Sequence, residues 1–253
     1  MTFSPGGPAA TRRSPVEWRL RLQRAMQLPT RCGHTYFSGS LGPGSMLVDL
    51  GAHRGAFASE VCARHACRCI AVEPDAELFA AIPERDGLTK INAAICRDSG
   101  DVTLYRTIDS EAGSLIDTGQ SEASRVRVAG RRLDDLLAEN RIGRIDLLKI
   151  DIEGAEEMLF DSIKDRTLYD VSQITIEFHD HLVERTSIES IIRRLESLGF
   201  LYINFAGGPD HADCLFLNLR ALISKGHFRP ILYVLVLKSY FALRRRAPAE
   251  GIS

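Results

Sequence analysis

Polar residues follow several apolar runs in the sequence, and each run has the length of a β-strand. These polar residues are Asp49, Glu73, Asn92, Asp151 and His179. In an open parallel sheet the carboxyl ends of the strands share one edge, and ligands bind beyond that edge. A carboxylate that ends a central strand is costly to bury without a partner. The pattern therefore predicts one functional site rather than scattered surface charges.

The glycine-bearing turn after the first run indicates which kind of ligand this site binds. Gly51 and Gly55 lack the Cβ that would hinder a sharp turn or a close approach to a ligand. The following helix, expected from residue 56, presents an N-terminus that accepts negative charge. A second strand then ends in Glu73, close to the spacing of about 20 residues expected of a ribose-binding acid. The stretch predicts a βαβ unit of a nucleotide-binding sheet.

The turn has the pattern Asp49-x-Gly51-x-x-x-Gly55, with Ala52 directly after the first glycine. It lacks the second glycine that makes room for a dinucleotide pyrophosphate. An acid before the turn suits a cationic ligand better than a phosphate. S-adenosylmethionine has an ammonium, a sulfonium and a ribose but no phosphate, so it is the expected cofactor. A nicotinamide-dependent oxidoreductase is the alternative.

A second stretch, Lys149–Gly154, brings two carboxylates together. Asp151 and Glu153 are two residues apart and point the same way on an extended chain. An alcohol oxygen is a weak nucleophile until its proton is removed, so we expect Asp151 or His179, which titrates near neutrality, to act as the general base. Glu153 would orient the acceptor. A metal-free site is predicted, with a divalent ion held by Asp151, Glu153 and His179 as the alternative.

The next two acids, Glu156 and Glu157, have a simpler expected role. They fall in the first turn of the following helix, where acids stabilise the helix dipole.

Strands alternate with helices through most of the chain, which predicts an α/β protein with a doubly wound, mostly parallel sheet and a hairpin-like final pair. The segments are predicted as a disordered tail over 1–14, a helical cap over 15–43, the main domain over 44–220 and a helical tail over 221–253. The polar stretch 107–124 is predicted to be a lid on the acceptor side, with a flexible surface loop as the alternative. A strand is expected over 89–95, with a hairpin added after the turn at 97–100.

Composition narrows the function classes. With 253 residues, 45% of them hydrophobic, the chain can bury one substantial core. A net charge of −1 gives no reason to expect a nucleic-acid partner. The six cysteines form no C-x-x-C pair, and the first residues lack the apolar stretch of a secretory signal, so a cytoplasmic protein with reduced thiols is expected.

The C-terminal tail is apolar over 230–243 and then continues with three arginines. It is shorter than the roughly 20 apolar residues that span a bilayer. Two interpretations stay open: a helix docked on the core or on the second subunit of a homodimer, or peripheral contact with the inner face of a membrane through residues 228–246.

Five motifs carry a resemblance to a known family. In chain order they are Asp49-Leu50-Gly51-Ala52-x-x-Gly55, Glu73-Pro74, Asn92-Ala93-Ala94, Leu133-Asp134-Asp135-Leu136 and Lys149-Ile150-Asp151-Ile152-Glu153-Gly154-Ala155-Glu156. From about Gly44 to Leu217 the chain resembles the FkbM family of class I, S-adenosylmethionine-dependent O-methyltransferases. The resemblance implies a Rossmann-like seven-stranded sheet with an antiparallel last strand. It also implies methylation of a hydroxyl on a sugar, a glycolipid or a polyketide-like product.

The resemblance further implies which residues bind the cofactor: Asp49, Gly51, Ala52, His53, Gly55, Glu73, Asn92 and Ala93. The methionine end falls at the glycine turn, the ribose at Glu73 and the adenine near Asn92. Asp151 would lie near the transferable methyl group. His53 stands where the family more usually has asparagine. A non-catalytic module that binds S-adenosylmethionine is a further alternative.

Overall fold

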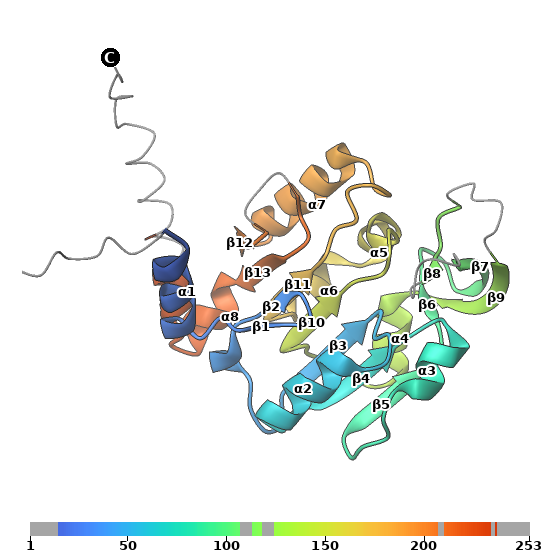
Figure 1. Ribbon diagram of the computed structural model, residues 1–253, viewed down its shortest axis with the longest axis horizontal. Helices are drawn as coiled ribbons and strands as arrows, with labels where there is room; N and C mark the ends of the chain where they lie inside the picture. Colours follow the sequence, from blue (N-terminus) through green and yellow to red (C-terminus); the bar gives the residue numbers. More distant parts are fainter. Residues whose placement is uncertain (1–14, 107–112, 118–123, 207–209, 234–235, 237–253) are drawn as a thin grey trace, which may run out of the picture.

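The computed structural model describes residues 15–106, 113–117, 124–206, 210–233 and 236 (Figure 1). The strands of its main sheet are β3 (Met46–Leu50), β4 (Arg68–Val72), β5 (Leu88–Ile91), β10 (Leu147–Ile150), β11 (Gln173–Ile176), β12 (Phe200–Asn204) and β13 (Cys214–Asn218). They form a seven-stranded sheet in the order β12-β13-β11-β10-β3-β4-β5. β13 is antiparallel to both of its neighbours, and the five strands from β11 to β5 are parallel. The predicted α/β sheet with an antiparallel last strand is confirmed.

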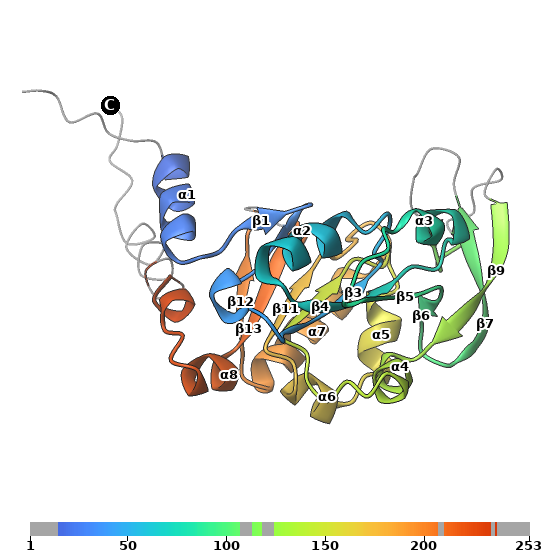
Figure 2. The same cartoon turned by 90° about the horizontal axis from the view of Figure 1, so that it is seen from below.

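Helices cover both faces of this sheet, and every residue of its central strands β3, β10 and β11 is buried. The helices after β3 are α2 (Ala56–His65), α3 (Ala76–Ala81), α4 (Leu133–Glu139), α5 (Glu156–Ser162), α6 (Asp165–Tyr169), α7 (Arg185–Ser197) and α8 (Leu219–Ser224). Figure 2 shows α2 on one side of the sheet and α4 and α5 on the other. Val48 and Leu50 of β3 pack towards α4, α5 and α7, whereas Leu47 packs towards α2.

The N-terminal segment packs against strands β11 and β13 of the main sheet. It consists of α1 (Pro15–Ala25), a short hairpin of β1 (Thr30–Arg31) and β2 (His34–Thr35), and the 3-10 turn η1 (Ser38–Ser40). Thr35 is anchored because its backbone N–H and its hydroxyl both donate to the Asp213 carboxylate, at 2.8 and 2.6 Å. Phe37 is buried in a cluster with Leu215 and Leu217 of β13. The hairpin, which the sequence did not suggest, thereby carries His34 into the protein interior.

A second, four-stranded sheet lies at the opposite end of the molecule (Figure 1). Its strands are β6 (Ala94–Ile95), β7 (Gly100–Arg106), β8 (Gly113–Ser114) and β9 (Ser124–Arg131), in the order β6-β9-β7-β8. The prediction of one strand over 89–95 was wrong, because the Asn92 amide donates to the carbonyls of Glu73 and Pro74 and the chain leaves the main sheet there. β7 pairs with β9 rather than with the preceding β6.

Several predicted features fall outside the described residues. These are the tail over 1–14, most of the lid over 107–124 and the basic end of the C-terminal tail over 237–253. Within the described part, Tyr233 is buried against Phe205, with ring centroids 6.0 Å apart, while Phe228 and Leu232 are exposed. None of the helices in the described part is both long and apolar enough to cross a membrane. The predicted membrane and subunit contacts stay predictions.

Candidate functional site

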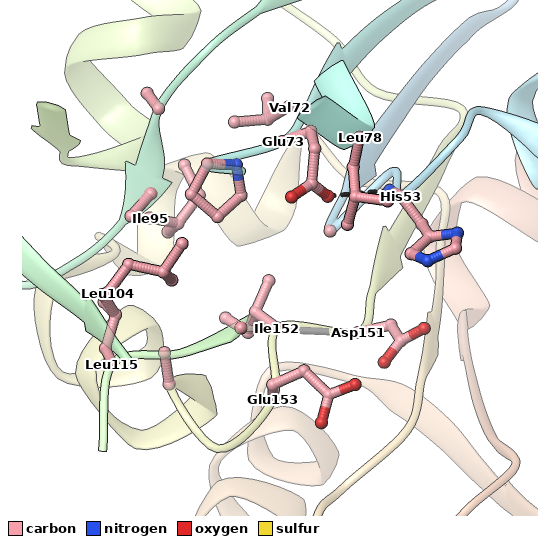
Figure 3. Close-up of a pocket in the computed structure, with 16 residues that line it drawn as sticks. His53, Val72, Glu73, Leu78, Ile95, Leu104, Leu115, Asp151, Ile152 and Glu153 are labelled. Atoms are coloured by element: carbon pink, nitrogen blue, oxygen red, sulfur yellow. Dashed lines mark hydrogen bonds between the residues drawn. The ribbon is translucent and has the colours of Figure 1, made fainter. Parts of the chain in front are cut away.

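A pocket with an empty volume of about 650 Å³ lies beyond the carboxyl ends of β3, β4 and β10 (Figure 3). Of the predicted cofactor residues, it is lined by Gly51, His53, Glu73 and Ala93. Of the predicted catalytic residues, it is lined by Asp151 and Glu153. Asp49, Ala52, Gly55 and Asn92 do not line it. The convergence of β3, β4 and β10 at this edge is the arrangement expected of a ligand site in a parallel sheet.

Gly51 makes the room between the ends of β3 and β10. Its φ is +71°, and a Cβ on this residue would lie 1.7 Å from the Asp151 carbonyl oxygen. Any side chain here would therefore separate the two strand ends that form the pocket floor. Glycine is required at position 55 for a different reason. Its φ is +74°, and a Cβ on this residue would lie 2.9 Å from the Ile82 side chain.

Glu73 lines the pocket where β4 ends. It is 5% exposed, and its two oxygens accept the backbone N–H groups of His53 and Asp75 at 2.8 and 2.9 Å. Burial raises the pKa of Glu73 to about 7, against the opposing effect of these two hydrogen bonds. Each oxygen keeps acceptor capacity that a ribose hydroxyl could use.

Asn92 contributes to the same end indirectly. Its amide bridges the carbonyls of Glu73 and Pro74 at 2.8 and 3.0 Å, so it fixes the turn that carries the carboxylate. Ala93 then lines the pocket beside Ile95 and Leu104. This apolar wall, visible in Figure 3, suits a flat adenine ring.

Asp49 lies inside β3 and is completely buried. Lys149 of β10 is its register partner, and the Lys149 Nζ lies 3.3 Å from the Asp49 Oδ1. The same ammonium lies 3.3 Å from the Asp151 Oδ2. Burial opposes the charge on Lys149, but the two carboxylates outweigh it and raise the pKa of Lys149. The protein therefore supplies a cation of its own for Asp49, and a contact between Asp49 and the cofactor stays a prediction.

The predicted catalytic residues do come together. The His179 Nε2 lies 3.2 Å from the Glu153 Oε2 and 3.7 Å from the Asp151 Oδ1. On its other side, the Nδ1 lies 2.9 Å from the Oε1 of Glu156, which is completely buried. Glu156 therefore does more than favour the helix dipole, the role expected from the sequence. Its neighbour Glu157 is exposed, as that role requires.

The protonation states differ from the sequence-based expectation. Burial opposes the charge on His179, but Glu153 and Glu156 outweigh it and raise the pKa of His179 to about 10. His179 is thus an imidazolium at neutral pH and not the near-neutral base that was predicted. Burial also opposes the charge on Asp151, but Lys149, followed by His34 and His179, holds the pKa of Asp151 well below its usual range.

Two residues of the site were missed. His34 of β2 is 1% exposed, and its Nε2 lies 3.4 Å from the Asp151 Oδ2. Glu177 is half-buried beside it, and burial followed by the charge of Asp151 raises the pKa of Glu177. Glu177 precedes His179 by two positions, so the rule that paired Asp151 with Glu153 would have found it. Nothing in the sequence signals His34, because 117 residues separate it from Asp151.

Comparison with known proteins agrees with this geometry. Residues 49–202 match the model of the methyltransferase FkbM domain. A 105-residue stretch is 37% identical to the AMB antimetabolite synthetase AmbE of Pseudomonas aeruginosa, a match that spans 42% of this chain and only 5% of that protein.

Solved structures give weaker likenesses. The fibrillarin pre-rRNA processing protein of Methanococcus jannaschii is 12% identical with a TM-score of 0.42, covering 80% of this chain and 74% of that one. The precorrin-6y C5,15-methyltransferase of Geobacter metallireducens is 11% identical with a TM-score of 0.36, covering 84% and 92%. The family match includes the glycine turn, Glu73 and the stretch from Asp151 to His179. It spans more than half of the sequence. The chain therefore belongs to the FkbM family of S-adenosylmethionine-dependent methyltransferases.

Proposed function

We propose that this methyltransferase acts on a hydroxyl oxygen of a sugar, a glycolipid or a polyketide-like product. The observation that carries the proposal is the division of the pocket into two unlike ends. One end is apolar, with the Glu73 carboxylate beside it, and the other presents Asp151 and Glu153 (Figure 3). The first end fits a nucleoside. The second offers the hydrogen-bonding groups that a hydroxylated acceptor needs.

The residues present fit S-adenosylmethionine. Glu73 has acceptor capacity for ribose hydroxyls, and the wall formed by Ile95, Leu104 and Leu115 fits an adenine. When bound, S-adenosylmethionine supplies a sulfonium-linked methyl group, which the acceptor oxygen takes in exchange for its proton, leaving a neutral thioether and a released proton.

Asp151 is the group that we assign to that proton. A hydroxyl proton becomes strongly acidic once its oxygen begins to bond to carbon, so a weak base that stays ionised is sufficient. The Lys149 ammonium keeps Asp151 ionised, and Asp151 lines the pocket. The His179 imidazolium, held between Glu153 and Glu156, fixes the Glu153 carboxylate beside the acceptor.

The test is the Asp151→Asn variant in a transfer assay with radiolabelled S-adenosylmethionine and a panel of sugar, lipid and polyketide-like alcohols. Loss of the proton acceptor should lower kcat by about 10²–10⁴-fold, while calorimetry should show little change in S-adenosylmethionine affinity. Glu157→Gln, on the exposed side of the same turn, is the matched control and should keep full activity.

Undiminished turnover in Asp151→Asn would remove this residue from the reaction. Transfer by the wild type to amines or thiols but to no alcohol on the panel would refute the proposed acceptor class. Binding of S-adenosylmethionine without transfer to any acceptor would favour the non-catalytic alternative.

A further inference from the structure

We propose that Asp151, Glu153 and His179 form a binding site for a divalent cation of the Mg²⁺ or Mn²⁺ type at the acceptor end of the pocket. The three side chains each offer one ligand atom, and these atoms lie within 4.8 Å of one another. The cation would take the place of the proton on the His179 Nε2, because a metal-binding nitrogen must be deprotonated. Two carboxylates and one neutral imidazole then make a mixed oxygen and nitrogen set that suits such ions.

The spacing of the ligand atoms matches a coordination shell. Ligands around Mg²⁺ lie at about 2.1 Å, so adjacent ligands of an octahedron are roughly 3.0 Å apart. The His179 Nε2 lies 3.2 Å from the Glu153 Oε2 and 3.7 Å from the Asp151 Oδ1. All three ligand atoms lie within 4.8 Å of one another, so an ion between them would draw the two carboxylate oxygens inwards. Both carboxylates border the open pocket, so the remaining coordination positions can be filled by water or by acceptor oxygens.

The Glu156 carboxylate, on the far side of the His179 ring from the proposed ion, gives a second, independent observation. A histidine that binds a metal through one nitrogen usually donates its other N–H to a carboxylate, which fixes the ring. Here Glu156 takes that place at 2.9 Å from the Nδ1, so the Nε2 faces Asp151 and Glu153. Glu156 is completely buried, and its Oε2 has no hydrogen-bond partner among the described residues. A buried carboxylate of this kind needs positive charge next to it. The His179 imidazolium supplies that charge, and a cation bound through the Nε2 would supply it in place of the proton.

The backbone also holds Glu153 in an uncommon conformation. Its φ is +52°, in the left-handed region that residues other than glycine rarely adopt. The Ser114 hydroxyl donates to the Glu153 carbonyl at 2.6 Å and braces this turn. The turn aims the carboxylate to the same side of the pocket as that of Asp151 (Figure 3).

A second set of three possible ligands, His34, Asp151 and Glu177, shares one residue with the first. It is the poorer site, because its shared oxygen, the Asp151 Oδ2, already lies 3.3 Å from the Lys149 ammonium. A cation bound to that oxygen would be repelled by Lys149 at close range. The Asp151 Oδ1 faces away from Lys149 towards His179, so the structure favours the set with Glu153.

A cation at this place would hold the acceptor by its hydroxyl oxygens and lower the pKa of the hydroxyl that it binds. This role rests on the proposed function, whereas the binding of the cation does not. The two can therefore be tested separately on one sample.

The experiment uses the full chain, stripped with EDTA, titrated with Mn²⁺ and followed by the electron paramagnetic resonance of free Mn²⁺. One ion per chain is expected in the wild type. Glu156→Gln should weaken binding about 10- to 100-fold, and Glu153→Gln, which loses a ligand, should weaken it further. Glu177→Gln is the matched control and should bind Mn²⁺ as the wild type does. Thermal melts followed by circular dichroism establish that each variant is folded.

Absence of Mn²⁺ binding by the wild type overturns the proposal, as does equal binding by folded Glu153→Gln. Loss of binding in Glu177→Gln but not in Glu153→Gln also overturns it. Calorimetry with S-adenosylmethionine on the EDTA-treated wild type separates the two hypotheses. Cofactor binding there without any Mn²⁺ binding leaves the proposed function in place and refutes only the cation site.

Discussion

Glu73 and Asp151 are two carboxylates of the same pocket whose acidities move in opposite directions. Burial raises the pKa of Glu73 to about 7. Asp151 meets the same opposing effect of burial, yet its pKa is held well below the usual range. The two residues directly follow β4 and β10, the strands on either side of β3, and they differ mainly in what surrounds them.

The difference lies in the charge of the neighbours. Glu73 is bound by two neutral backbone N–H groups, whereas Asp151 has the Lys149 ammonium at 3.3 Å and His34 at 3.4 Å. Neutral donors offset only part of the cost of burying a negative charge, and a full positive charge nearby reverses it. One fold therefore keeps one carboxylate poised to change protonation near neutrality and the other permanently ionised.

Removing the Lys149 ammonium should abolish the difference in pKa between Asp151 and Glu73, and it should give the largest loss of stability. In Lys149→Met, completely buried Asp49 loses its counter-charge, so the free energy of unfolding should fall by about 3–5 kcal/mol. The pKa of Asp151 should rise at the same time. Urea unfolding and the ¹³C carboxyl shifts of aspartate measure the two changes. Adding Asp49→Leu should recover much of the stability, because no uncompensated charge then remains in β3. A single variant as stable as the wild type would show that Lys149 does not balance Asp49.

Removing the charge of Glu73 should have a smaller effect, confined to ligand binding. Glu73→Gln keeps the shape but loses the charge-assisted hydrogen bonds to a ribose, each of which contributes about 1.5–3 kcal/mol. Calorimetry should show S-adenosylmethionine affinity lowered by roughly 10- to 100-fold. Glu84→Gln, an exposed substitution outside the pocket, should bind as the wild type does. Equal affinity of Glu73→Gln and the wild type would remove Glu73 from the ribose site.

The fold and the Glu73 end were predictable because their signals are local. Fully buried strands that alternate with helices give apolar runs of characteristic length, and the acid lies at a fixed spacing from the glycine turn. The break between β5 and β6 has no such signal. It depends on hydrogen bonds from Asn92 to carbonyls 18 and 19 residues earlier, inside a stretch that is otherwise typical of a continuous strand.

The charges of the acceptor end were less predictable than its residues. The alternation of side chains along a strand grouped Asp151 with Glu153, and the shared sheet edge added His179. The charge on His179 depends on Glu156, whose position at the start of a helix indicates a surface role, yet which is completely buried. His34 lies on a hairpin 117 residues before Asp151 in the sequence, so only the tertiary structure brings it next to Asp151.

The smallest expected effect is a pH dependence that belongs to Glu73 alone. Burial raises its pKa from the ordinary 4.5 to about 7. Between these values the unfolded chain binds fewer protons than the folded one, so the Glu73 contribution makes the folded state less stable as pH rises through this window. S-adenosylmethionine binding should show the opposite trend, because a ribose hydroxyl donates best to the ionised carboxylate. If only the ionised form binds, Kd should fall about tenfold from pH 6 to pH 8.

Calorimetry at several pH values checks this trend, and Glu73→Gln, with weaker binding, should give a flat profile over the same range. Lys149→Met should keep this pH dependence but move it to higher pH, provided that the variant remains folded, because the Lys149 charge lowers the pKa of Glu73. A slope that persists in Glu73→Gln would assign the titration to another group. A wild-type Kd independent of pH would mean that the ligand does not distinguish the two forms of Glu73, and the contrast with Asp151 would then have no consequence for binding.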